Sequence, residues 1–190
     1  MTLKQYRFAD AMIFIILAFA SSFISEYVYH LMPLKFYYFN LSMLVSLILI
    51  VRWGFVGAIA FAVSGIPVLL YRGGSADMIF QVSFYILANL GIGLSILTFK
   101  WMNKNKIGHT FIHTLTYLLI AFTGLIILKG LFFIFIGVDP IQMSIQFFWG
   151  EAFNMIITVV LFLIIGKLSD GLIGDMTDYI LTLQREKEQI

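Results

Sequence analysis

The sequence predicts an all-α integral membrane protein, a six-transmembrane-helix bundle with both termini in the cytoplasm. Of the 190 residues, 61% are hydrophobic and only 12% are charged, whereas soluble domains carry about 25% charged residues. The apolar runs show no strand-like alternation, so in lipid they must be helical, because the backbone has no water to bond there. No polar stretch is long enough for a soluble core, so residues 1–190 are predicted to form a single membrane domain.

The spans follow from the apolar runs, since a transmembrane helix needs roughly 20 mainly apolar residues. The second and third runs are short, but Arg52, Trp53 and Gly54 between them favour two spans joined by a tight turn. Arginine needs water there, tryptophan prefers the membrane interface, and glycine suits a turn. Pro67 is expected to kink the third span or to end it. The first run lacks a cleavage site and is interpreted as a retained span. The predicted spans are about 8–28, 36–51, 55–70, 78–99, 111–137 and 143–168.

The orientation follows from lysine and arginine, which are enriched in cytoplasmic loops. With six spans, nine of the twelve basic residues fall on the side of the termini. Lys35 and Arg72 fall on the other side, and Lys129 lies within a span. Both termini are therefore predicted to be cytoplasmic, and residues 170–190 are predicted to form an amphipathic cytoplasmic tail.

Two charges, Lys129 and Glu151, interrupt long apolar runs. A charge in hydrocarbon costs about 3 kcal/mol on insertion scales, so such a residue normally faces a protein interior or a wet cavity. Lys129 should lie roughly 27 Å from the inner end of its helix, and Glu151 roughly 12 Å below the outer end of its own. Two structural alternatives stay open: Lys129 could reach the outer headgroups, or the two residues could simply form an ion pair.

Polar residues of several spans are expected at the same outer level. Gln81, Tyr85 and Asn89 follow an i, i+4, i+8 spacing, which predicts a polar stripe on one helix face, although such a stripe could also serve only as interhelical hydrogen bonds. Glu26 and His30 could likewise be interfacial only. The inner halves are plainer, which favours an outward-facing pocket over a channel or a proton relay. The predicted substrate-binding residues are Glu26, His30, Arg72, Gln81, Tyr85, Asn89, Lys129, Gln146, Trp149, Glu151 and Asn154.

The sequence carries no motif typical of an enzyme. It has no cysteine, P-loop, HExxH segment or serine nucleophile elbow, so we expect no catalytic site, no cofactor and no metal. His109 and His113 are four residues apart but lie at a loop–helix junction without nearby carboxylates, which favours an interfacial role. The short basic loop before them is explained by the orientation rule, so no nucleic-acid binding is expected.

Three segments carry a resemblance to a known family. They are "NLSMLVSLILIVRWGFVGAIAFAVSGI", "YRGGSADMIFQVSFYILANLGIGLSILTFK" and "WGEAFNMIITVVLFLIIGKL", which together cover most of the chain. In them the chain resembles the S component, the substrate-binding membrane subunit, of energy-coupling factor (ECF) vitamin transporters. The resemblance implies a multi-pass protein of the bacterial plasma membrane that binds a small water-soluble vitamin or related metabolite near the external face.

The resemblance also implies partners and residue roles. The partners would be a transmembrane coupling subunit and two cytoplasmic ATPases, and the whole binding unit would topple in the bilayer during transport. Small residues of the first span, here Ala18 and Ser22, would contact the coupling subunit. Lys129 and Arg72 could receive a carboxylate and Glu151 an amine or amide, so an anionic or zwitterionic ligand fits best.

A membrane scaffold is the alternative function. In length and in its charged C-terminal tail the chain also resembles MreD, the rod-shape-determining protein of cell-wall machinery. A channel or an ion-coupled transporter is less favoured, because no inverted repeat is detectable. In the scaffold interpretation the tail would dock on a partner or lie on the membrane. Its predicted apolar face comprises Leu172, Met176, Tyr179, Ile180 and Leu183.

Overall fold

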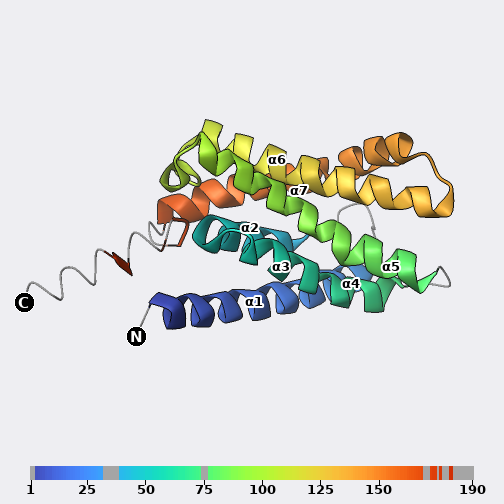
Figure 1. Ribbon diagram of the computed structural model, residues 1–190, viewed down its shortest axis with the longest axis horizontal. Coiled ribbons are helices and arrows are strands. Elements are labelled where there is room, and N and C mark those ends of the chain that lie inside the picture. Colours follow the sequence, from blue (N-terminus) through green and yellow to red (C-terminus); the bar gives the residue numbers. More distant parts are fainter. Residues whose placement is uncertain are drawn as a thin grey trace, which may run out of the picture.

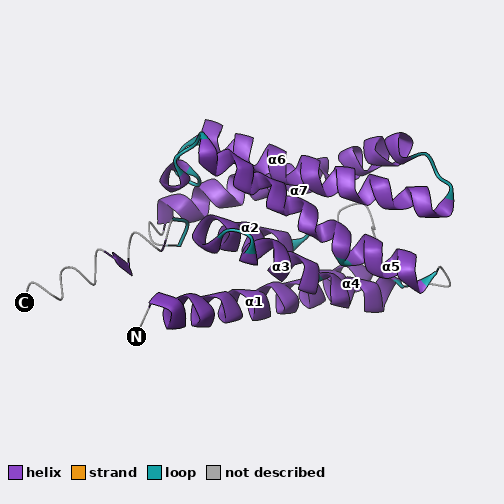
Figure 2. Cartoon of the chain, viewed as in Figure 1, coloured by secondary structure: helices purple, strands orange, loops and turns teal. Residues whose placement is uncertain are grey.

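The computed structural model describes residues 3–31, 39–73, 77–168, 172–174, 176 and 180–181, and this part of the chain forms helices and no strands (Figures 1 and 2). The α-helices are α1 (Leu3–Leu31), α2 (Leu41–Trp53), α3 (Val56–Val63), α4 (Gly65–Arg72), α5 (Met78–Tyr85), α6 (Phe111–Phe132) and α7 (Pro140–Leu168). Three 3₁₀ helices join them: η1 (Leu87–Lys100), η2 (Lys104–Lys106) and η3 (Phe133–Ile136). The prediction of an all-helical protein is confirmed for these residues.

Four helices are long and apolar enough to cross a membrane: Leu3–Leu31, Met78–Lys100, Phe111–Ile136 and Pro140–Leu168. They correspond to the first, fourth, fifth and sixth predicted spans, and they fit a multi-pass membrane protein. The second and third predicted spans appear instead as shorter apolar helices, Leu41–Trp53 and Val56–Arg72. The 13 residues of α2 extend only about 20 Å, less than the roughly 30 Å of a hydrocarbon core. The six-span count and the orientation of the termini therefore stay predictions.

The short helix α2 lies at the centre of the bundle and is buried on all sides. It packs against α1, α3 and η1, and most of its residues have almost no exposed surface, as Leu47 and Ile50 illustrate. A helix that is apolar all round is typical of a core or of a membrane span. Here the neighbouring helices, and not lipid, surround α2.

The third predicted span is broken into α3 and α4 at Ser64. Pro67 has no N–H to bond the Val63 carbonyl, so a regular α-helix cannot continue through this turn. The Ser64 hydroxyl instead donates to the Phe61 carbonyl oxygen at 2.8 Å. The prediction that Pro67 would interrupt this span is confirmed, with the break lying one turn before the proline.

The helix η1 packs along α6 through two glycines. A Cβ atom at Gly91 would meet the Gly124 carbonyl, and a Cβ at Gly124 would meet the Gly91 carbonyl, both at distances that no real contact allows. Small residues at such a crossing let two backbones approach closely, as is typical of helices in membranes. The η1–α6 contact fixes one wall of the site described below.

The two ends of the bundle differ in charge. The start of α1, the α2–α3 turn, the η1–α6 connection and the end of α7 lie together at one end (Figure 1). The α4–α5 connection and the α6–α7 turn lie at the other. The first end holds most of the basic residues that the structure describes: Lys4, Arg7, Arg52, Lys100, Lys104, Lys106 and Lys167.

Arg52, at the α2–α3 turn, is buried and not solvated. Its guanidinium donates from Nε and Nη2 to the two carboxylate oxygens of Asp10, each at 2.9 Å, and from Nη1 to the Leu172 carbonyl at 3.1 Å. Trp53 Nε1 donates to the same carboxylate at 2.6 Å. The expectation that Arg52 needs water is thus corrected, since Asp10 supplies the compensating charge. The turn itself is confirmed, with Gly54 at a φ of 68°.

The predicted tail 170–190 falls mostly outside the described residues. Of its predicted apolar face, Tyr179 and Leu183 lie outside them. Met176 and Ile180 are buried against the bundle, together with Ile173. The described part of this segment is therefore packed against the protein core.

Candidate solute-binding site

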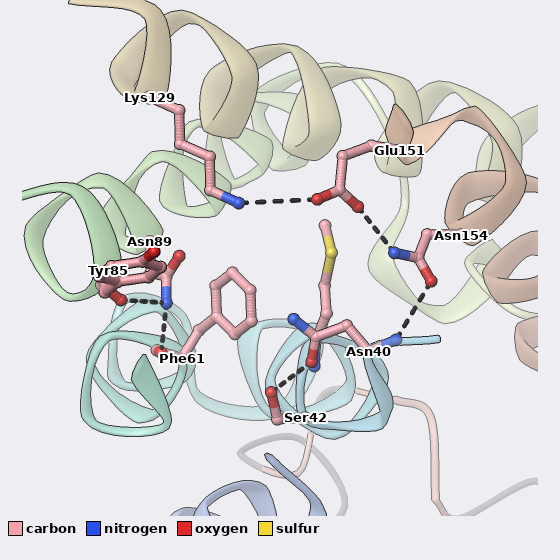
Figure 3. A network of polar contacts seen from close by, with 9 residues as sticks. Asn40, Ser42, Phe61, Tyr85, Asn89, Lys129, Glu151 and Asn154 are labelled. Atoms are coloured by element: carbon pink, nitrogen blue, oxygen red, sulfur yellow. Dashed lines mark hydrogen bonds and ion pairs between the residues drawn. The ribbon is translucent and has the colours of Figure 1, made fainter. Parts of the chain in front are cut away.

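A cavity of about 160 Å³ lies among α4, α5, η1, α6, α7 and the N-terminal end of α2. Figure 3 shows Lys129 of α6 and Glu151 of α7 pointing toward each other in this region. Three charged side chains, three neutral polar ones and three apolar ones line the cavity. The lining residues are Asn40, Val68, Arg72, Phe84, Tyr85, Asn89, Lys129, Phe147 and Glu151.

Lys129 and Glu151 face each other across this cavity, as the structural ion-pair alternative predicted. Lys129 Nζ lies 3.6 Å from Glu151 Oε1, and each side chain is 16% exposed. The helices α6 and α7 are antiparallel, so Lys129, about two helical turns before the connection, and Glu151, about three turns after it, can face each other. Charge-assisted hydrogen bonds are usually about 2.7–2.9 Å long, so this pair is loosely closed.

Aromatic rings border the same pair. The ammonium of Lys129 lies 5.7 Å from the ring centroid of Phe84 and 5.9 Å from that of Phe147. These two rings are 5.5 Å apart and also contact Phe133 of η3. Cations within about 6 Å of a ring face gain attraction from its quadrupole. The aromatic residues therefore hold the Lys129 side chain in the cavity and away from the surface.

Glu151 is oriented by a chain of hydrogen bonds (Figure 3). Asn154 Nδ2 donates to Glu151 Oε2 at 2.8 Å, and the backbone N–H of Asn40 donates to Asn154 Oδ1 at 3.1 Å. Asn40 is the N-cap of α2, where its side chain accepts from the Met43 N–H at 3.3 Å and from the Ser42 hydroxyl at 2.6 Å. One oxygen of Glu151 is therefore fixed, and the other faces Lys129.

The chain of hydrogen bonds continues into the core as far as α1. The hydroxyl groups of Ser64 and Ser42 are 3.1 Å apart, and the Ser22 hydroxyl donates to the Ser64 carbonyl at 2.7 Å. Sequence reasoning missed Asn40, Ser42 and Ser64. The signal for Asn40 was present, because an asparagine directly before an apolar helical run is a preferred N-cap.

Ala18 and Ser22 lie inside the protein and not on its surface. Both have no exposed area, and Ser22 takes part in the network just described. Their small side chains allow α1 to pack closely against α2, α3 and α4. The prediction that this pair forms the surface for a coupling subunit is therefore corrected, since the chain's own helices cover it.

Asn89 lies at the change from α-helix to 3₁₀ helix. Its backbone N–H donates to the Ile86 carbonyl at 3.2 Å, one residue short of the α-helical partner Tyr85. Its side-chain Nδ2 takes over, donating to the Tyr85 carbonyl at 2.9 Å and to the Phe61 carbonyl at 3.1 Å. The hydrogen-bonding alternative for the polar stripe is thus confirmed at Asn89, although this residue and Tyr85 also border the cavity.

Glu26 and Arg72 form a second ion pair beside the cavity. Arg72 Nε donates to Glu26 Oε2 at 2.8 Å, and the guanidinium lies 4.7 Å from the centroid of the Tyr29 ring. Glu26 is fully buried, so the interfacial alternative is wrong for it. Only Arg72 lines the cavity, which makes Glu26 a residue that positions Arg72 and not a ligand contact.

The structure does not bring the other predicted site residues to the cavity. His30 is exposed at the end of α1, with its ring 5.4 Å from that of Tyr71, and Gln81 is buried without lining the cavity. Gln146 and Trp149 are exposed. Residues of an α-helix are about 100° apart, so Trp149 points roughly 160° away from Glu151. Asn154 is only about 60° away, which explains why, of the three predicted polar neighbours on α7, it is the one that bonds Glu151.

No family model matches the chain, and neither does any curated protein or solved structure. The chain is a helical protein that fits multiple membrane crossings, and it holds a small, partly enclosed cavity with two cations and one carboxylate.

Proposed function

We propose that this protein is the solute-binding subunit of an ECF-type importer, and that it binds a small water-soluble vitamin or related metabolite near the external face of a bacterial plasma membrane. The observation that carries the proposal is the cavity between Arg72 and the Lys129–Glu151 pair. Charges inside a membrane bundle are costly and usually mark substrate or ion pathways. Here they surround a space rather than filling it.

The charges suggest an anionic or zwitterionic ligand. A ligand carboxylate would lie between Lys129 and Arg72, and Glu151 Oε1 would accept from a ligand amine or amide. The rings of Phe84 and Phe147 offer an apolar face for the rest of the molecule. A cavity of about 160 Å³ is below the usual range of about 300–1,000 Å³ for drug-sized ligands, so the ligand is small or the loose ion pair opens to admit it.

Transport would depend on partners, because the sequence has no P-loop to hydrolyse ATP. The proposal therefore includes a transmembrane coupling subunit and two cytoplasmic ATPases, as the resemblance to S components implies. It leaves Ala18 and Ser22 out of the coupling surface, since both are covered by α2, α3 and α4.

The test is thermal unfolding of the purified protein with a panel of water-soluble vitamins. A ligand at 100 times its Kd stabilises a protein by about 2.7 kcal/mol, which is a clear shift of the melting temperature. Lys129→Met and Glu151→Gln should reduce the shift by about half or more, because a tenfold weaker Kd leaves about 1.4 kcal/mol of stabilisation. Lys106→Gln, which removes an exposed charge outside the cavity, should keep the full shift.

Two results would overturn the proposal. One is that no vitamin or related metabolite shifts the melting temperature. The other is copurification with cell-wall synthesis proteins in place of an ATPase pair, which the scaffold alternative predicts.

A further inference from the structure

A second hollow lies at the opposite end of the bundle, between the first turns of α1 and the start of α3. It has a volume of about 400 Å³. Its walls are apolar and exposed, with Phe8 69%, Met12 41% and Ile59 45% exposed. Lys4 and Arg7 border the same hollow. A spacing of i, i+3, i+4 and i+8 places Lys4, Arg7, Phe8 and Met12 on one face of α1.

The two cations of this hollow lack a carboxylate partner in the part of the chain that the structure describes. Lys4 and Arg7 are both exposed, and neither forms an ion pair there. The carboxylate of Asp10, one turn along the helix from Arg7, is occupied by Arg52 and Trp53. Among the described residues, Lys4 and Arg7 thus form a positive pair that no carboxylate contacts.

Arg7 is held at the edge of the hollow. Its guanidinium lies 5.6 Å from the centroid of the Trp53 ring, and Nη2 donates to the Trp53 carbonyl at 3.5 Å. Trp53 itself is buried, so it anchors the Arg7 side chain from inside the protein. The hollow therefore runs from a basic end at Lys4 and Arg7 to an apolar floor.

We propose that this hollow, the α1–α3 groove, binds one anionic phospholipid. The phosphate lies between Lys4 and Arg7, and an acyl chain runs over Phe8, Met12 and Ile59. Basic pockets between helices on the cytoplasmic side of a membrane are suited to anionic headgroups. A zwitterionic lipid would bring its own cation against Lys4 and Arg7, and a soluble anion would leave the apolar floor uncovered. The inference rests on a membrane around the bundle with this end on the cytoplasmic side, as the sequence predicts, and it is independent of the solute cavity.

The test is native mass spectrometry of the full chain with phosphatidylglycerol and phosphatidylcholine of the same acyl chains. The expected result is one retained phosphatidylglycerol and no retained phosphatidylcholine. The double variant Lys4→Gln/Arg7→Gln should bind phosphatidylglycerol about thirty-fold more weakly, because each basic residue near an anionic surface contributes about a five-fold gain in binding. Both positions are exposed and the Arg7 hydrogen bond to Trp53 is long, so the melting temperature in phosphatidylcholine nanodiscs should change little.

A matched control removes the same charge from the same end of the bundle. Lys100→Gln/Lys106→Gln changes two exposed lysines outside the groove and should bind phosphatidylglycerol as the unmodified chain does. An equal loss in this control would overturn the proposal, since binding would then follow the net charge alone.

A third variant tests the acyl chain. Ile59→Trp fills the groove and leaves both cations in place, so it should also weaken phosphatidylglycerol binding. Unchanged binding in this variant, or equally strong binding of glycerol phosphate, would show an anion site without a lipid tail. A dimer that Ile59→Trp dissociates and phosphatidylglycerol does not affect would show that a second copy covers the groove. Each of these results contradicts a lipid site.

Discussion

Two charge pairs at opposite ends of the bundle are built in different ways. Arg52 and Asp10 form a closed pair with two hydrogen bonds of 2.9 Å, and Trp53 Nε1 also donates to Asp10 while Arg52 Nη1 donates to the Leu172 carbonyl. Lys129 and Glu151 form an open pair at 3.6 Å beside a cavity. The closed pair holds α1, the α2–α3 turn and the C-terminal segment together, whereas the open pair retains capacity for another polar group. The geometry of an ion pair, and not its presence, thus separates a structural contact from a candidate binding site.

The largest expected effect comes from breaking the closed pair. Arg52→Met leaves the Asp10 carboxylate without its partner, and removing one member of a buried pair costs about 3–5 kcal/mol. The free energy of unfolding should fall by this amount, measured by denaturant titration in detergent. The double variant Asp10→Asn/Arg52→Met should recover much of the loss. An unchanged free energy of unfolding for Arg52→Met would show that the pair does not stabilise the fold.

The next effect concerns the η1–α6 contact, which forms one wall of the candidate site. Gly124→Ala places a Cβ against the Gly91 carbonyl, and overpacking of this kind costs about 1–3 kcal/mol. Gly150→Ala in α7 is the matched control, because a Cβ there meets nothing within 4 Å. In the helix this control should be neutral or stabilise by about 0.5–1 kcal/mol. Equal melting temperatures for the two variants would contradict the close approach.

A smaller effect is expected at the N-cap of α2, beside the open pair. Asn40→Ala removes the acceptor for the Met43 N–H and should cost about 1 kcal/mol of unfolding free energy. Asn103→Ala removes the same type of cap from η2, a helix of three residues without buried side chains. Asn103→Ala should therefore lower the unfolding free energy by less than Asn40→Ala does, and thermal unfolding of both variants under the same conditions measures the difference. A larger loss at Asn103 would mean that the cap of α2 does not support the site.

A further effect on stability, smaller than that at the closed pair, is expected at the open pair itself. Lys129→Met should lower the unfolding free energy without ligand by less than Arg52→Met does, because Lys129 and Glu151 are 3.6 Å apart and Glu151 keeps its hydrogen bond from Asn154. It should nevertheless weaken binding of a carboxylate ligand at least tenfold, since hydrogen bonds to charged groups contribute about 1.5–3 kcal/mol. Calorimetric titration measures the second quantity. A stability loss as large as that of Arg52→Met would remove the distinction between the pairs.

The sequence predicted the long helices well and the central one poorly. Continuous apolar runs indicated the four long helices, whose bounds agree with the predicted spans to within a few residues at most ends. The run that became α2 is equally apolar, since a helix buried in protein and a helix buried in lipid need the same composition. Hydropathy therefore could not distinguish a span from a core helix.

The candidate site was predictable where helix geometry alone decides it. Lys129 and Glu151 flank one short turn, and Asn154 follows Glu151 by three residues, so their meeting needed only antiparallel helices. Trp149 could have been excluded by its angle on the same helix. The partners of Glu26 and Arg52 depend on tertiary packing between segments far apart in the chain, which spacing does not reveal.

The 3₁₀ winding of η1 changes what this helix can reach. A run of 14 residues is long for this conformation. A 3₁₀ helix rises about 2.0 Å per residue instead of about 1.5 Å, so η1 extends about 28 Å where an α-helix would extend about 21 Å. Together with α5, the segment Met78–Lys100 reaches about 40 Å, close to the length of the 29-residue α1. The 3₁₀ winding thus gives the shortest of the four candidate spans nearly the same length as the longest.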